Sequence, residues 1–185
     1  MKNLFLFFAI FLFFSFKANT QEVNMLLKLE HGEVEIKLFP DVAPKHVERF
    51  TNLVKNKKYD GVVFHRVIDG FMAQTGDVKY GNSLDKNYDL NKAGTGGSDL
   101  PDLKAEFNNI PHVRGTLSMA RSANPNSANS QFFICFQPAP FLDRQYTVFG
   151  KVIEGMEFVD KIKRGDQNQN GAVENPDKII SFKSI

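Results

Sequence analysis

The stretch GTLSMARSANPNSANSQFFICFQPAPFLD, residues 115–143, contains two short apolar segments separated by a polar loop. Residues 115–119 and 131–136 have the length and the branched or aromatic content of β-strands. Side chains alternate along a strand. The second segment is thereby divided into two faces, with Phe132, Ile134 and Phe136 on one and Gln131, Phe133 and Cys135 on the other. We interpret the first face as core and the second as leading to a pocket.

A second stretch, FHRVIDGFMAQTGD at residues 64–77, begins within a strand-like segment at 62–67. An isolated arginine on a strand is by default a surface cation. Here, alternation places Arg66 on the same face as Phe64 and opposite His65. Apolar neighbours are unusual for a merely solvated charge. Arg66 is therefore a candidate functional cation, and His65 is interpreted as structural.

The segment before these stretches predicts a hairpin and a helix. Residues 25–30 and 33–38 flank a turn at His31–Gly32, and in the second segment Val34, Ile36 and Leu38 alternate with charged side chains. After Pro44, which suits a first helical turn, apolar residues recur at helical spacing to about Asn56. We expect this helix to pack its apolar stripe on a sheet.

The rest of the chain adds a long loop, two strands and a short helix. Residues 76–109 are rich in Gly, Asn, Asp and Ser, which predicts a loop that is functional or ordered by its own contacts. Further strands are predicted at 146–153 and 179–182, and a helix around Met156–Ile162 that Gly165 could cap. Many short strands with two helices indicate an all-β barrel or sandwich, without repeats or a second domain.

The first twenty residues have the layout of a secretory signal peptide. Lys2 precedes thirteen nearly uninterrupted apolar residues at 4–16, and a polar stretch follows at 17–21. Thirteen helical residues reach only about 20 Å, short of the roughly 30 Å hydrocarbon core of a bilayer. We therefore expect residues 1–20 to be a leader and 21–185 the mature domain, with an uncleaved anchor as the alternative.

Charge and composition exclude several classes of function. The chain has 23 Lys and Arg and 21 Asp and Glu; removal of the leader deletes Lys2 and Lys17, which leaves 21 of each sign. A neutral domain is not expected to bind nucleic acid. Cys135, the single cysteine, lies among aromatic residues and is predicted to be a buried, inert thiol. The motifs GxSxG, HExxH and CxxC are absent, so neither a metal nor a cofactor is expected.

Together, the two stretches resemble the cyclophilin family of peptidyl-prolyl cis/trans isomerases. The resemblance extends over essentially the whole mature chain, and further matching segments are LFPDVAPKHVERF, KAEF at 104–107 and YTVFGKVIEGMEFVDKI at 146–162. The 76–109 loop and the end of the chain look like those of compact bacterial members. The resemblance implies an all-β fold, a closed eight-stranded antiparallel barrel capped by two α-helices.

The resemblance also implies a set of site residues. Arg66 matches the catalytic arginine, and Gln74 and Gln131 match groups that bind the substrate backbone. The family's proline pocket corresponds to Phe71, Met72, Phe133 and Leu142. Ala120 and Arg121 fall where the family binds the residue before proline. Phe141 and Tyr146 stand where many members have Trp and His, and both replacements keep an aromatic wall.

Elementary chemistry makes Arg66 suitable for this reaction. Rotation about a peptide bond costs about 18 to 20 kcal/mol, because resonance makes the C–N bond partly double. As the bond twists, the imide nitrogen gains a lone pair. A fixed donor aimed at that nitrogen stabilises the twisted state more than either planar state. A guanidinium remains charged and presents several donors in a fixed fork.

The sequence therefore predicts an exported, monomeric isomerase that assists the folding of proline-containing, unfolded or partly folded proteins. The bacterial periplasm is the expected compartment, with a secretory lumen or the extracellular space as alternatives. The rival hypothesis is a chaperone module that holds proline-containing segments, with incidental turnover. An exchange assay on a short Ala-Pro peptide separates the two.

Overall fold

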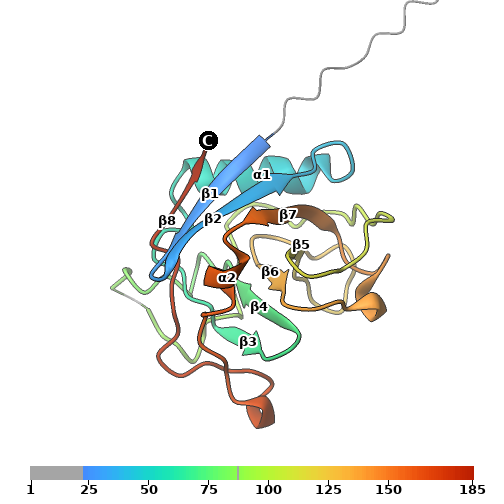
Figure 1. The fold of residues 1–185 in the computed structure, drawn as a ribbon. Helices are drawn as coiled ribbons and strands as arrows, with labels where there is room; N and C mark the ends of the chain where they lie inside the picture. Colours follow the sequence, from blue (N-terminus) through green and yellow to red (C-terminus); the bar gives the residue numbers. More distant parts are fainter. Residues whose placement is uncertain (1–22, 87) are drawn as a thin grey trace, which may run out of the picture.

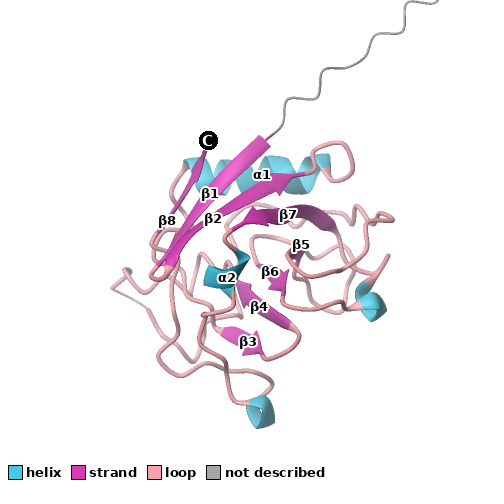
Figure 2. Cartoon of the chain, viewed as in Figure 1, coloured by secondary structure: helices cyan, strands magenta, loops and turns pink. Residues whose placement is uncertain are grey.

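The structure is a computed structural model that describes residues 23–86 and 88–185. It contains one eight-stranded antiparallel sheet, two α-helices and two 3₁₀ turns (Figures 1 and 2). The strands are β1 (Val23–Leu29), β2 (Gly32–Leu38), β3 (Arg66–Ile68), β4 (Met72–Thr75), β5 (Thr116–Met119), β6 (Phe132–Cys135), β7 (Val148–Glu154) and β8 (Ser181–Ser184). The helices are α1 (Pro44–Lys55) and α2 (Met156–Val159), and the turns are η1 (Pro140–Leu142) and η2 (Gln167–Gln169).

The sheet curls into a barrel, and the two edge strands are joined by the segments that precede them rather than by pairing with each other. Its strand order is β3-β4-β6-β5-β7-β2-β1-β8. The segments just before the edge strands bond to each other: Ile179 N donates to Val62 O over 2.9 Å, and Phe64 N donates to Asp177 O over 2.8 Å. The eight-stranded barrel with two helices is thus confirmed, and short bridges rather than a continuous ladder make the closure.

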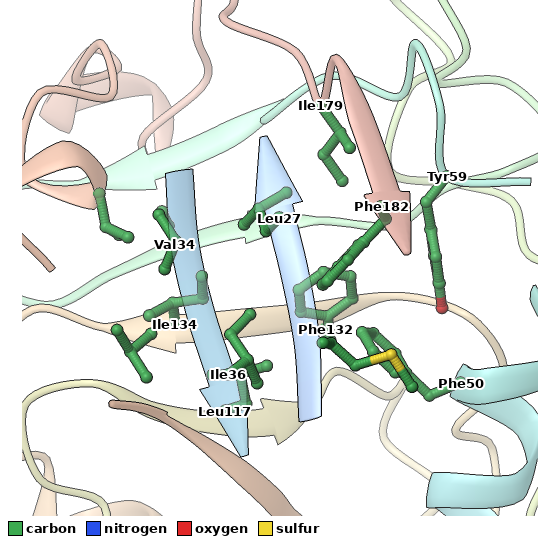
Figure 3. Close-up of a cluster of buried hydrophobic side chains, with 14 of the residues drawn as sticks. Leu27, Val34, Ile36, Phe50, Tyr59, Leu117, Phe132, Ile134, Ile179 and Phe182 are labelled. Atoms are coloured by element: carbon green, nitrogen blue, oxygen red, sulfur yellow. The ribbon is translucent and has the colours of Figure 1, made fainter. Parts of the chain in front are cut away.

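A cluster of buried aliphatic and aromatic side chains fills the barrel, and its aromatic rings attach α1 to it (Figure 3). Phe50 of α1 is fully buried, and its ring centroid lies 5.0–5.3 Å from four other rings, those of Tyr59, Phe132, Phe149 and Phe182. Burial of one such ring contributes about 1.5 to 3 kcal/mol. The helical stripe predicted from Pro44 onward is therefore the face that closes the barrel.

The predicted hairpin, first helix and long loop agree with the structure. β1 pairs with β2 from Val23–Leu38 to Leu29–Gly32, and α1 ends one residue before the expected Asn56. In the part of the 76–109 loop that the structure describes, Asp77 is fully buried and orders the backbone around it. Its carboxylate accepts from four backbone N–H groups at 2.8–3.0 Å, those of Lys79, Tyr80, Gly94 and Gly96.

Three local predictions were wrong. The strand expected at 62–67 is regular only over β3, and Phe64 joins the main core instead of accompanying Arg66. Residues 62 and 63 form isolated bridges only, so strand alternation does not extend across 64–65. Gly165 does not cap the second helix, which ends at Val159. A glycine is required at position 165 because the backbone of Gly171 lies too close to leave room for a Cβ there.

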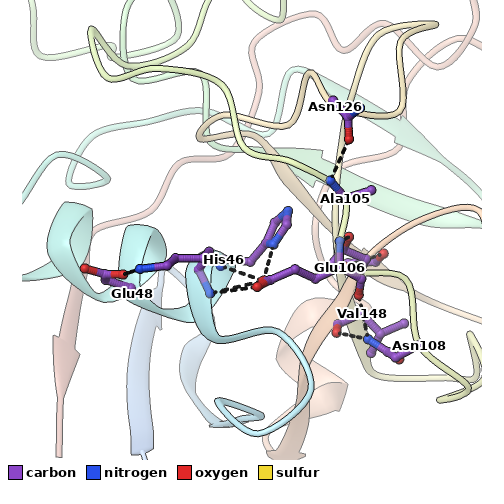
Figure 4. A network of polar contacts seen from close by, with 10 residues as sticks. His46, Glu48, Ala105, Glu106, Asn108, Asn126 and Val148 are labelled. Carbon is purple, nitrogen blue, oxygen red and sulfur yellow. Dashed lines mark hydrogen bonds and ion pairs between the residues drawn. The ribbon is translucent and has the colours of Figure 1, made fainter.

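A carboxylate from the KAEF segment caps α1 (Figure 4). Ala43, at the N-cap, provides no side-chain acceptor. Glu106 instead accepts from the backbone N–H groups of Lys45 and His46 over 3.1 Å, and it lies 2.6 Å from Nδ1 of His46. His46 is fully buried, so Glu106 satisfies both the helix end and a buried ring nitrogen.

Replacing Glu106 by Ala should lower the free energy of unfolding by about 1 to 3 kcal/mol, because both bonds to the helix and the partner of His46 are lost. Urea denaturation measures this. Glu48→Ala is the matched control: Glu48 forms an exposed pair with Lys45, so a loss of under about 0.5 kcal/mol is expected. Equal losses in the two variants would contradict the capping role.

Candidate active site

One groove of about 410 Å³ brings together ten of the eleven predicted site residues. These are Arg66, Phe71, Met72, Gln74, Ala120, Arg121, Phe133, Phe141, Leu142 and Tyr146. The eleventh, Gln131, lines an adjoining polar hollow of about 520 Å³ that shares Gln74, Ala120 and Arg121 with the groove. Gln145 also lines the groove and was not predicted.

Arg66 enters the groove from β3, opposite Gln74 on β4. Its Nη1 donates to Gln74 Oε1 over 3.2 Å, while Nε and Nη2 donate to the carbonyl and side-chain oxygens of Asn170, each over 2.9 Å. Gln74 in turn donates to Gln131 Oε1 over 2.9 Å. Partial burial lowers the pKa of Arg66, but an arginine at neutral pH stays charged. The guanidinium is therefore a fixed cation held by neutral oxygens.

An apolar slot lies beside the guanidinium. Met72, Phe133 and Leu142 are buried in a cluster separate from the main core, as is Cys135. Phe133 faces this cluster while Phe132 faces the barrel interior, so the alternation predicted for 131–136 is confirmed. Burial raises the pKa of the Cys135 thiol to about 12, which agrees with an inert thiol.

Aromatic side chains form the rim of the slot. The Phe71 and Phe141 rings lie 5.4 Å apart, and Phe141 is 62% exposed. The Tyr146 ring packs edge-on against Phe133, with 6.0 Å between centroids. The guanidinium of Arg121 lies 4.4 Å from the Tyr146 ring centroid, so this cation borders the groove as well. The slot can hold an apolar ring while leaving the rest of a peptide accessible.

Gln131 connects the groove to the loop ordered by Asp77. Its Nε2 donates to the carbonyls of Gly94 and Gly96 over 2.9 and 2.7 Å, and its Oε1 accepts from Gln74. Gly94 has a φ of 96°, and a Cβ there would lie 2.6 Å from the ring of His65. The loop thus rests directly on His65, in agreement with a structural role for that residue.

The arrangement suits binding and electrostatic stabilisation more than covalent chemistry. Within residues 23–86 and 88–185, no three His, Cys, Asp or Glu side chains are grouped so that they could hold a metal ion. The groove offers a fixed cation, two amides and an apolar slot. Such a site can bind an apolar ring and stabilise charge that develops on an adjacent atom.

Residues 23–184 match the family described as "Cyclophilin type peptidyl-prolyl cis-trans isomerase/CLD". The chain belongs to the cyclophilin family. It is accordingly a peptidyl-prolyl cis-trans isomerase, an enzyme that acts on proline-containing protein substrates.

Relatives of this cyclophilin include bacterial proteins. It is 62% identical over 159 residues to a Brucella suis protein named "Probable peptidyl-prolyl cis-trans isomerase", covering 86% of this chain and 81% of the relative. An Acinetobacter baylyi peptidyl-prolyl cis-trans isomerase is 40% identical over 86% of this chain and 85% of its own length.

Solved structures share the fold. Cyclophilin AquaCyp293 from Hirschia baltica superposes with a TM-score of 0.72 at 26% identity, covering 88% of this chain and 75% of that one. A Cryptosporidium parvum cyclophilin-type isomerase gives a TM-score of 0.75 at 25% identity, covering 89% of this chain and 98% of that one.

Asn170 and Gln145 are the site residues that sequence reasoning missed. Asn170 lies beyond the quoted motifs, in a left-handed conformation after η2, and reaches Arg66 across 104 positions of sequence. Gln145 donates to Phe141 O over 2.9 Å and accepts from Arg121 through its own carbonyl. No local sequence pattern predicts the contacts of either residue. A search for polar residues flanking the motifs would have found Gln145 but not Asn170.

Burial of His65 makes stability depend on pH. His65 is 8% exposed, and burial lowers the pKa of its ring from about 6.5 to about 4, so the folded state favours the neutral form. The unfolded chain binds more protons between these values. The stabilisation is therefore complete above pH 6.5 and is lost progressively as the pH falls to about 4. The difference corresponds to roughly 3 kcal/mol.

We expect the free energy of unfolding to fall between pH 7 and pH 4 and this slope to become shallower in His65→Gln. The slope should not vanish, because burial also lowers the pKa values of His46 and His112. Urea denaturation at several pH values provides the measurement. His31→Gln, at the exposed β1–β2 turn, is the control and should leave the slope unchanged. A wild-type slope in His65→Gln would contradict this account.

Proposed function

We propose that Arg66 stabilises the twisted imide while the apolar slot holds the proline ring. Met72, Phe133 and Leu142 would form the floor and wall of the slot, with Phe71 at its rim. Gripping the ring leaves the preceding residue free to rotate. The fixed position of the guanidinium beside the slot, imposed by Gln74 and Asn170, is the observation that carries this proposal.

The polar groups would align the substrate backbone. Gln74 and Gln131 present amide groups along the boundary between the groove and the adjoining hollow. Ala120 and Arg121 line both spaces, where the backbone before proline would run. Phe141 and Tyr146 would complete the aromatic wall around the ring. No general base, nucleophile or cofactor takes part, because rotation breaks no σ bond.

Arg66→Ala should lower kcat/KM by about a hundred- to a thousandfold, since loss of one such donor removes about 3 to 4 kcal/mol of transition-state stabilisation. A protease-coupled or NMR exchange assay on a short Ala-Pro peptide gives the rate. Arg114→Ala is the matched control, because this guanidinium pairs with Asp160 outside the groove. Near wild-type turnover in Arg66→Ala would refute the arginine mechanism.

The same assay tests the rival hypothesis of a chaperone module that only holds proline-containing segments. A wild-type chain that binds the peptide but leaves its exchange rate unchanged would favour that module.

We further propose that the enzyme works outside the cytoplasm, in the periplasm, as a monomer that assists the folding of exported proteins. The support is the leader-like pattern of residues 1–20, which lie outside the described residues. Within the described ranges, none of the helices combines the length and the apolar character that crossing a bilayer requires.

Export predicts that the protein purified from its native host begins near residue 21 and is released with the periplasmic fraction. Intact-mass spectrometry and cell fractionation test this. Replacing Leu6 and Phe7 by Asp interrupts the apolar run of the leader. This variant should keep its full-length mass and stay in the cytoplasm, because the apolar run is what the export machinery recognises. An uncleaved wild-type chain in the membrane fraction would show an anchor instead.

A further inference from the structure

His112 forms hydrogen bonds with both ends of the turn that makes the outer wall of the groove. This turn, residues 139–143, contains η1 and carries Phe141 and Leu142. At its start, Ala139 N donates to the carbonyl of His112 over 2.8 Å. At its end, Asp143 Oδ1 accepts from the backbone N of His112 over 2.8 Å and lies 2.9 Å from ring Nδ1. A carboxylate only accepts, so Nδ1 is the donor.

The same imidazole lies behind the floor of the slot. It is 1% exposed and stacks on the Phe133 ring, with 6.2 Å between centroids and 17° between planes. Its other nitrogen, Nε2, lies 3.0 Å from Ser118 Oγ on β5, the strand that pairs with β6. One buried side chain thus contacts the floor residue Phe133 and anchors the wall that carries Leu142.

The turn needs such an anchor because it has few bonds of its own. Pro138 and Pro140 lack an N–H group, and within the turn only Leu142 and Asp143 donate to preceding carbonyls, at 3.0 and 3.1 Å. Leu142 is 7% exposed, whereas Phe141 is 62% exposed and can contribute little to holding the turn in place. The other bonds to the turn come from Gln145 and Tyr146, which follow it closely in the chain and donate to the carbonyls of Phe141 and Leu142. The His112–Asp143 contacts are thus the side-chain bonds that join the turn to a segment distant in the sequence.

We propose that His112 and Asp143 are positioning residues for the isomerase reaction, which set the width of the slot between Phe133 and Leu142. The proposal rests on the proposed role of this slot as the proline site. Neither residue lines the groove, so both act through the residues that do. A slot held at the width of a proline ring binds it with less loss of freedom than a slot whose wall moves.

Asp143→Ala removes the acceptor and should raise KM for a short Ala-Pro peptide about five- to tenfold, with kcat changed by less than about twofold. Affinity for the Ala-Pro dipeptide, followed by NMR titration, should weaken by the same factor. Asp143→Asn keeps Oδ1 as an acceptor for both His112 donors and should stay within about twofold of wild type. The side chain of Asp143 is 34% exposed, so these variants are expected to fold.

Arg144→Gln is the matched control, since it removes a neighbouring exposed charge without touching His112 and should leave KM unchanged. His112→Phe keeps a stacked ring but loses both nitrogens. Combined with Asp143→Ala, it should raise KM by less than the product of the two single effects, because the two residues act as a unit.

A purely structural role would lower the unfolding temperature of Asp143→Ala and leave KM and dipeptide affinity unchanged, which would overturn the proposal. Fully multiplicative effects in the double variant would overturn it as well. An inactive wild-type enzyme would be a separate result, because it would refute the proposed function of the slot rather than the positioning by His112.

Discussion

Strand β6 is buried on both faces, and the position of the site depends on this single constraint. Phe132 and Ile134 pack in the barrel interior, whereas Phe133 and Cys135 belong to the floor of the groove. A slip of one residue would exchange the two sets and place Phe133 in the aromatic cluster around Phe50. Strand β6 therefore cannot shift its register without disrupting the core, and this fixes Phe133 in the floor of the groove.

The strands next to β6 extend this constraint to the polar groups. Gln74 on β4 and Ser118 on β5 both pair in register with Phe133, and Arg66 on β3 pairs with Gln74. The guanidinium, the amide and the slot floor are thus arranged across consecutive strands of one ladder. Rigid placement of this kind is what electrostatic stabilisation requires, because donors that must first reorient lose much of their effect.

Periodicity in the sequence predicted only a small part of the site. Alternation at 131–136 separated core from pocket correctly, and helical spacing after Pro44 identified the face of α1 that carries Phe50. The motif resemblance supplied the groove residues. These residues lie on β3, β4, β6 and η1, and no periodic pattern in the sequence relates these elements to one another.

The remaining features depend on contacts between distant segments. β4 was missed because its residues, Met72–Thr75, include only one β-branched side chain and no aromatic ring. Phe64 was placed on the wrong face because alternation was extended over two residues that form no strand. Gly165 was taken for a helix cap, yet what it accommodates is the close approach of Gly171. Local patterns do not contain such packing information.

The partners of Arg66 hold this half-buried cation in place without cancelling its charge, which suits the catalytic role that we propose for it. Among residues 23–86 and 88–185, no carboxylate lies within ion-pair distance of its guanidinium, and the oxygens that bind it belong to Gln74 and Asn170. Neutral oxygens fix the fork without cancelling its field, whereas a carboxylate would offset most of it at the imide nitrogen. The desolvation that lowers the pKa of Arg66 is thus left uncompensated by a counter-charge. In the mechanism that we propose, the electron pair that develops on the twisted nitrogen would offset part of that cost, and the two planar states would not.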